Sequence, residues 1–143
     1  MIAVDTNILV YAHRKDSPWH EKSSNLVRQL AEGDRPWAIP WPCAHEFLAI
    51  VTHAKIYRPP SPLAIALGQL ESWMESPGLV MIGEPEGYWS EFRDMAVLGK
   101  ILGGAVHDAR IAAICRAHGV QELWSADRDF SRFPRQKVRN PLI

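Results

Sequence analysis

Several features are scarce or missing in this 143-residue sequence, and each absence removes a class of protein. Cysteine occurs twice, as Cys43 and Cys115, and no Cys/His spacing typical of a zinc site is present. One disulfide is possible on count alone, but the apolar helical settings of both residues favour two reduced core thiols. No apolar run approaches the roughly 20 residues that a helix needs to span a bilayer.

Net charge is also missing, because 16 Lys and Arg residues balance 16 Asp and Glu residues. The distribution is uneven, since positions 100–143 hold eight basic and four acidic residues, a net +4, which leaves −4 on positions 1–99. The basic third could be an electrostatic footprint for nucleic acid. On charge alone, we favour the alternative, an ordinary solvated surface with an incidental bias.

What remains is the composition of a globular protein, 47% hydrophobic and 22% charged. The length suits a single domain over residues 1–143, and we find no internal repeat, low-complexity tract or linker. The first predicted strand begins at Ile2, which leaves no room for a signal peptide before it. We therefore expect a cytoplasmic location.

Strand and helix patterns alternate along the chain, which predicts an α/β fold. We expect a central, mostly parallel sheet of about five strands with helices on both faces. The predicted strands are 2–5, 37–40, 79–83, 122–125 and 137–139. The predicted helices are 7–13, 19–32, 41–54, 62–76, 86–101 and 105–118, with Gly119 just beyond the last helix as its C′ residue.

Two of the predicted strands end in a carboxylate. Asp5 follows the apolar run 1–4, and Asp127 follows 122–126. In open α/β sheets, ligands bind at the carboxyl edge of the strands. Asp5 could equally be the N-cap of the helix that follows it. Asp129 lies two residues beyond Asp127, and one of these two could instead be a turn-forming residue.

Two further acids lie on apolar helices. Glu46 shares a stripe with Cys43 and Ile50, where a carboxylate costs several kcal/mol unless it is paired or bound to a metal. A salt bridge to Arg or Lys is the alternative to a functional role. Asp108 lies in the first turn of an apolar helix, where the helix dipole also favours a negative charge.

Four acids at one sheet edge would repel each other unless a cation lies among them. A set of oxygen ligands without cysteine is typical of Mg²⁺ or Mn²⁺ sites. Asn7 disfavours a haloacid-dehalogenase-type phosphatase, which would need a second Asp at that position. A phosphate-accepting receiver domain is disfavoured too, because no Asp follows the strands that end at Pro40 and Gly83.

The order of these motifs resembles that of PIN-domain ribonucleases and, more narrowly, VapC-type toxins of toxin–antitoxin pairs. The resemblance rests on 5-DTNILVY-11, Glu46, 106-VHDAR-110 and 125-SADRDF-130, and it covers essentially the whole chain. It implies a Mg²⁺-dependent endoribonuclease (Mn²⁺ being possible), restrained by a small antitoxin and active as a homodimer.

The resemblance also assigns roles to residues. Asp5, Asp108 and Asp127 would bind the metal and Glu46 would orient water, so that these four acids form the catalytic set. Asp129 would be a neighbour of Asp127, and Thr6, Asn7 and Ser125 would support the site through hydrogen bonds. Candidate RNA contacts are Arg14, Arg110 and Arg128.

Two other functions stay open from sequence. One is a PIN nuclease that processes RNA or DNA without an antitoxin. The other is a non-catalytic, metal-binding regulatory domain.

Overall fold

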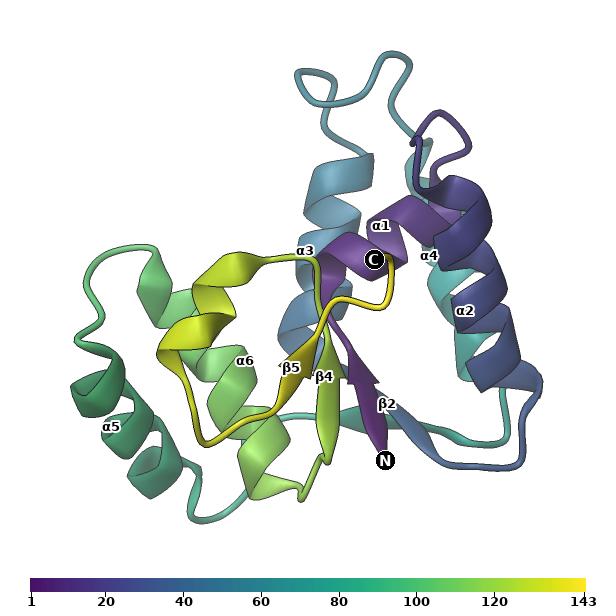
Figure 1. The fold of residues 1–143 in the computed structure, drawn as a ribbon. Coiled ribbons are helices and arrows are strands. Elements are labelled where there is room, and N and C mark those ends of the chain that lie inside the picture. The colour runs from purple at the N-terminus through teal and green to yellow at the C-terminus, as the bar shows by residue number, and fades with distance from the viewer.

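A five-stranded parallel sheet forms the centre of the computed structural model, which describes residues 1–143 (Figure 1). The strand order is β3-β2-β1-β4-β5, and every neighbouring pair is parallel. The strands are β1 (Ile2–Val4), β2 (Trp37–Pro40), β3 (Leu79–Ile82), β4 (Glu122–Trp124) and β5 (Val138–Arg139). The predicted parallel sheet is therefore confirmed.

Six helices connect the strands, and Figure 1 shows α5 and α6 on one side of the sheet and α1, α2 and α4 on the other. Their bounds are α1 (Thr6–His13), α2 (His20–Glu32), α3 (Trp41–Val51), α4 (Leu63–Met74), α5 (Tyr88–Gly99) and α6 (Ala105–Ala117). None of the helices is long and apolar enough to cross a membrane.

The largest difference from the predicted helices is the end of α3. It ends at Val51 rather than at residue 54, and Thr52 is its C-cap. The Thr52 hydroxyl donates a hydrogen bond to the Leu48 carbonyl at 2.6 Å, a local bond of the kind that competes with helix continuation. The 3₁₀ helix η1 (Arg128–Arg132) was not predicted, because a single turn has no periodic pattern.

The core lies between the sheet and the helices. All four residues of β2 are buried, as expected of a strand covered on both faces. Trp37 is fully buried, and its indole N–H donates to the Ser76 hydroxyl at 3.0 Å. Both cysteines are buried and free, which confirms the prediction of reduced core thiols.

The pairing of β1 with β4 brings together segments that are far apart in the sequence. Val4 is in register with Trp124, so the residues that follow the two strands, Asp5 and Ser125, leave the sheet side by side. The Asp5 amide continues the ladder by donating to the Trp124 carbonyl at 2.9 Å. This register fixes the carboxyl edge on which the acidic residues gather.

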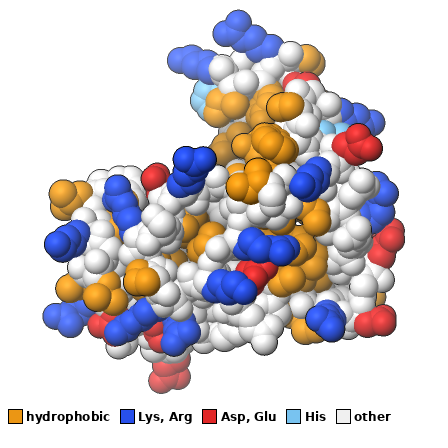
Figure 2. Space-filling view, in the orientation of Figure 1, with side chains coloured by type: hydrophobic (Ala, Val, Ile, Leu, Met, Phe, Trp, Pro, Cys, Tyr) orange, Lys and Arg blue, Asp and Glu red, His pale blue; other side chains and the backbone are white.

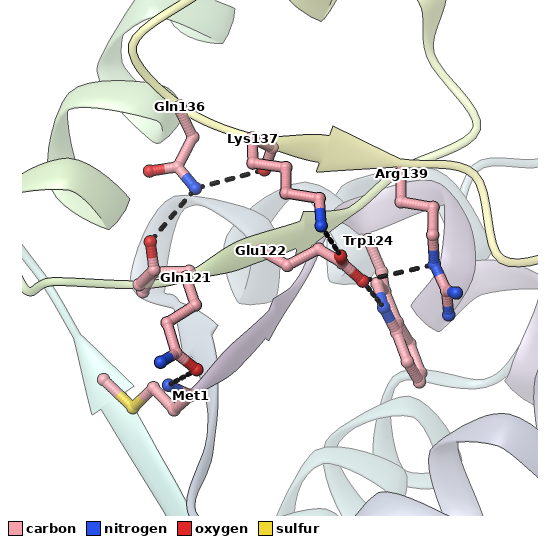
Figure 3. A network of polar contacts seen from close by, with 8 residues as sticks. Met1, Gln121, Glu122, Trp124, Gln136, Lys137 and Arg139 are labelled. Carbon is pink, nitrogen blue, oxygen red and sulfur yellow. Dashed lines mark hydrogen bonds and ion pairs between the residues drawn. The ribbon is translucent and has the colours of Figure 1, made fainter.

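A network of polar side chains holds the edge strand β5 against β4 (Figure 3). The Glu122 carboxylate accepts from the Trp124 indole at 2.9 Å and pairs with Lys137 at 3.1 Å and Arg139 at 3.2 Å. Burial alone would raise the pKa of Glu122, but these hydrogen bonds and charges lower it on balance. Charged side chains on an edge strand also discourage pairing with another chain.

We predict that Glu122→Ala lowers the free energy of unfolding by about 1 kcal/mol, because three partners of one carboxylate are lost together. The carboxylate has a lowered pKa in the folded state, so its stabilising effect is present above its ordinary pKa of 4.5 and is lost at lower pH. Urea denaturation near neutral pH and in acid measures this difference. Glu86→Ala, in an exposed loop, is the control.

Candidate active site

Asp5 is the most buried acid of the site, with 4% of its surface exposed. It occupies the N-cap position of α1, but its side chain makes no capping hydrogen bond to that helix. Its carboxylate instead accepts from the Ser125 hydroxyl at 2.6 Å and from the Cys43 thiol at 3.5 Å. One donor follows β4 and the other lies on α3, so the carboxylate is held from two sides. Asp5 therefore does not act as a simple helix cap.

A second set of hydrogen bonds fixes the loop after β4. The Asn7 carboxamide accepts from the Ala126 amide at 3.1 Å and donates to the Ser125 hydroxyl at 3.4 Å. That hydroxyl also accepts from the Asp127 amide at 3.0 Å. Asn7 and Ser125 therefore join the start of α1 to the segment that presents Asp127.

Glu46 is half-buried on α3 and accepts a hydrogen bond from the Thr6 hydroxyl at 2.7 Å. It forms no ion pair with Lys or Arg, which removes the salt bridge considered from sequence. Asp5 and Thr6 are consecutive residues in the turn from β1 into α1. This turn therefore positions Asp5 itself and, through the Thr6 hydroxyl, Glu46 as well.

Three aspartates converge beside these residues. Each of Asp108, Asp127 and Asp129 offers a carboxylate oxygen within 4.8 Å of the others. Asp108 is in the first turn of α6 and is half-buried. Asp127 caps η1 by accepting from the Asp129 amide at 2.8 Å, and this bond keeps Asp129 close to Asp127. Both candidates for the last acidic position thus lie next to Asp108.

The electrostatics of the cluster are unfavourable without a cation. Burial, opposed in part by the Ser125 hydrogen bond, raises the pKa of Asp5 to about 6. Burial and then the charges of Asp127 and Asp5 raise the pKa of Asp108 to about 6. No basic side chain forms an ion pair with any acid of this cluster. Unpaired carboxylates in such a setting fit a hard divalent cation with oxygen ligands.

Two hollows flank the acidic cluster. One, of about 270 Å³, is lined by Glu46 together with Pro42, His45, His107 and Arg110. The other, of about 500 Å³, is lined on one side by Ser125 and Asp127. The sequence did not lead us to expect His45, His107 or the second hollow as parts of a site. The positions of these features depend on how α3, α6 and η1 pack against each other.

The three predicted RNA contacts lie in different settings. Arg14 is bound within the protein, since it pairs with Asp16, donates to Ser61 and stacks on Tyr57, and its side chain is only 11% exposed. Arg14 lines neither of the two hollows beside the acidic cluster. Arg110 lines the smaller hollow and pairs with Glu84, whereas Arg128 is exposed and lines the larger one.

The basic C-terminal third is partly neutralised in the fold. Lys137 and Arg139 pair with Glu122, and Arg135 pairs with Asp94. Figure 2 shows Lys and Arg side chains dispersed over the face drawn, not gathered in one dense patch. The charge bias of the sequence therefore does not by itself define a nucleic-acid surface.

Comparison with known proteins identifies the class to which this fold and acidic site belong. A family model described as PIN domain matches residues 2–136, nearly the whole chain. Ribonuclease VapC48 of Mycobacterium tuberculosis is 34% identical over 138 residues, which cover 96% of this chain and 95% of the relative. Ribonuclease VapC43 of the same organism is 32% identical, covering 99% of this chain and 96% of the relative. The chain therefore belongs to the PIN-domain family and, within it, to the VapC group.

Solved structures agree on the fold. The VapBC2 complex of Rickettsia felis, bound to a DNA fragment from its promoter, superposes with a TM-score of 0.68 at 22% identity and covers 97% of this chain and 98% of that one. Mycobacterium tuberculosis VapC20, described as a toxin that cleaves the sarcin–ricin loop, superposes with a TM-score of 0.66 at 17% identity, covering 92% and 93%. At these identities the likeness establishes the fold alone.

The raised pKa values predict how stability depends on pH in the metal-free protein. Asp5 and Asp108 ordinarily titrate at 3.8 and here at about 6, so the folded state holds protons that the unfolded state releases between these values. Their contribution to the free energy of unfolding therefore falls as the pH rises from about 4 to about 6, and stays unfavourable above that. We expect Asp108→Asn to stabilise the protein in EDTA at neutral pH and to lose that advantage in acid.

Denaturant titrations at the two pH values measure this effect. Asp34→Asn, an exposed carboxylate in the α2–β2 loop, is the matched control and should change stability equally at both. A pH-independent effect of Asp108→Asn would contradict the electrostatic origin that we assign to it.

Proposed function

We propose that this protein is a Mg²⁺-dependent endoribonuclease toxin of a type II toxin–antitoxin system. The observation that carries the proposal is the cluster of unpaired carboxylates at the carboxyl edge of the sheet, in a chain that belongs to the VapC group. The similar proteins VapC48 and VapC43 are named ribonucleases, and we extend that activity to this chain.

Asp5, Asp108 and Asp127 are the proposed metal ligands, with Asp129 as a further oxygen donor. All are carboxylates, and Mg²⁺ or Mn²⁺ is the ion that this donor set suits best. When bound, the ion would make a water molecule more acidic and offset negative charge on the phosphoryl oxygens.

The protein's own residues supply orientation. The Ser125 and Cys43 hydrogen bonds hold Asp5 in one position, and partners of this kind typically contribute 10- to 100-fold to metal affinity or activity. The Thr6 hydroxyl leaves the other oxygen of Glu46 free to accept a proton from, or orient, an attacking water. Attack by water rather than by the ribose 2′-hydroxyl leaves a 5′-phosphate and a 3′-hydroxyl.

An antitoxin and a second copy of the chain are the proposed protein partners. Structural neighbours include toxin–antitoxin complexes, such as the DNA-bound VapBC of Salmonella typhimurium. Helix α4 leaves the apolar side chains of Leu63, Ile65 and Leu67 exposed, and a partner could cover some of them. A toxin of this kind would meet its RNA in the cytoplasm.

We expect Asp108→Asn to lower RNA cleavage by at least about a hundred-fold, because a metal ligand contributes no less than its supporting partners. Tightly induced expression of wild type and variant, followed by sequencing of RNA 5′-monophosphate ends, measures this effect in cells. Asp94→Asn is the control, since Asp94 is an exposed aspartate of α5 outside the cluster. New ends that persist with folded Asp108→Asn protein would disprove the site, and a wild type that produces none would favour a non-catalytic metal-binding domain.

Metal binding has a separate test that does not depend on cleavage. Mg²⁺ should raise the melting temperature of the wild type, because a ligand that binds only the folded state stabilises it. The double variant Asp108→Asn/Asp127→Asn should show little of this increase in a thermal melt with and without EDTA. Equal increases in both proteins would mean that the ion binds elsewhere.

A further inference from the structure

The larger of the two hollows beside the acidic cluster has no role in the function proposed above. It has a volume of about 500 Å³, within the range of roughly 300–1,000 Å³ typical of small-ligand pockets. We call it the Trp19 pocket. The lining residues used below are Tyr11, Trp19, Asp127, Arg128, Asn140 and Leu142. Asp127 belongs both to this pocket and to the carboxylate cluster, so a ligand here would lie directly beside the proposed cleavage centre.

Two aromatic side chains form part of the wall. Trp19 precedes α2 and is 40% exposed, although three of the other tryptophans, Trp37, Trp73 and Trp124, are buried. Trp41 and Trp89 are exposed as well, but Trp19 is the one of these three that lines the pocket, where its ring is open to a ligand. Tyr11 from α1 lines the same pocket.

Hydrogen bonds hold this wall in place. The Trp19 amide donates to the Ser17 hydroxyl at 3.1 Å, and the adjacent His20 ring contacts the Tyr11 carbonyl at 3.0 Å. Across the pocket, the Lys22 ammonium donates to the Leu142 carbonyl at 2.7 Å and ties the C-terminal segment to α2. The pocket is therefore built from segments that are fastened to each other. In Figure 1 the C-terminus lies beside α1. Figure 2, in the same orientation, shows hydrophobic side chains gathered in that region.

Polar groups complete the lining. Arg128 is exposed and forms no ion pair, so its guanidinium is available to a phosphate. The side-chain Oδ1 of Asn140 accepts from the Leu142 amide at 3.0 Å, which leaves the nitrogen of the same carboxamide to donate to a ligand. Aromatic faces, one amide donor and one guanidinium match the three parts of a nucleotide, which are a flat base, a hydrogen-bonding edge and a phosphate.

We propose that the Trp19 pocket binds the nucleobase of a nucleotide next to the scissile phosphate. The base stacks on Trp19, Asn140 contacts its edge, and Arg128 meets the adjoining phosphate. This inference rests on the proposed ribonuclease function and adds to it the residues that select the substrate's base. The bond to be cleaved then lies at the Asp127 side of the pocket.

Kinetics on a pool of short RNAs of random sequence test the stacking contact. Trp19→Ala should lower kcat/KM by on the order of ten-fold, as expected for the loss of one stacked base, whereas Trp19→Phe should keep most of the activity. Trp89→Ala is the matched control, because Trp89 is 67% exposed on α5 and does not line the pocket. Equal activities of Trp19→Ala and the wild type would overturn the proposal.

Crosslinking tests the contact without relying on cleavage. RNA carrying 5-iodouracil is irradiated with the wild type, with Ca²⁺ in place of Mg²⁺, and the modified peptides are mapped by mass spectrometry. We expect adducts on Trp19 or Tyr11, and adducts found only outside the pocket would contradict the assignment. This second readout holds even where a variant folds poorly.

The two readouts separate failure of the inference from failure of the proposed function. A wild type that cleaves no RNA but crosslinks at Trp19 would refute the nuclease and retain the base-binding pocket. A wild type that cleaves RNA, with Trp19→Ala equally active, would retain the nuclease and refute the pocket. Trp19→Ala protein that cleaves normally but escapes inhibition by its antitoxin would assign the pocket to a peptide and overturn the inference.

Discussion

The site depends on one hydrogen bond, from the Ser125 hydroxyl to the buried Asp5 carboxylate at 2.6 Å. It joins residues 120 positions apart in the sequence and it lies where β1 and β4 end together. The same hydroxyl accepts from the Asp127 amide, so the group that holds one acid also positions the loop that carries the next two. Together with the Asn7 carboxamide, which accepts from the Ala126 amide, this contact keeps the turn after β4 and its mutually repelling carboxylates near Asp5.

The acidic cluster is a compromise between folding and binding. Burial at the sheet edge makes Asp5 and Asp108 stronger ligands for a cation, and it also raises the cost of keeping both ionised in the cation's absence. The donors to these acids are neutral hydroxyl, thiol and backbone amide groups instead of Lys or Arg. Neutral donors orient the acids without cancelling their charge, which leaves that charge for a metal.

Much of this arrangement was predictable from sequence, because the signals are local. Apolar runs that alternate with helical patterns gave the order of the strands and helices, and Gly119 lies at φ 67°, as a C′ residue requires. The partner of Glu46 was not predictable, since Thr6 reaches it only through the packing of α1 against α3. The sequence led us to expect Asp127 beside Asp108 but left open the place of Asp129, because its position depends on the 3₁₀ turn of η1. The Trp19 pocket has no sequence signature, as its walls come from both ends of the chain.

The central position of β1 in the sheet has a consequence for synthesis on the ribosome. β1 is made first, yet its neighbour β4 is made about 120 residues later, so the pairing that builds the carboxyl edge is a long-range contact that closes slowly. A nascent chain that has not yet emerged through Ser125 lacks both the donor to Asp5 and the aspartates beyond it. The carboxylate cluster therefore assembles only after residues 125–129 have been translated, and shorter nascent chains are without it.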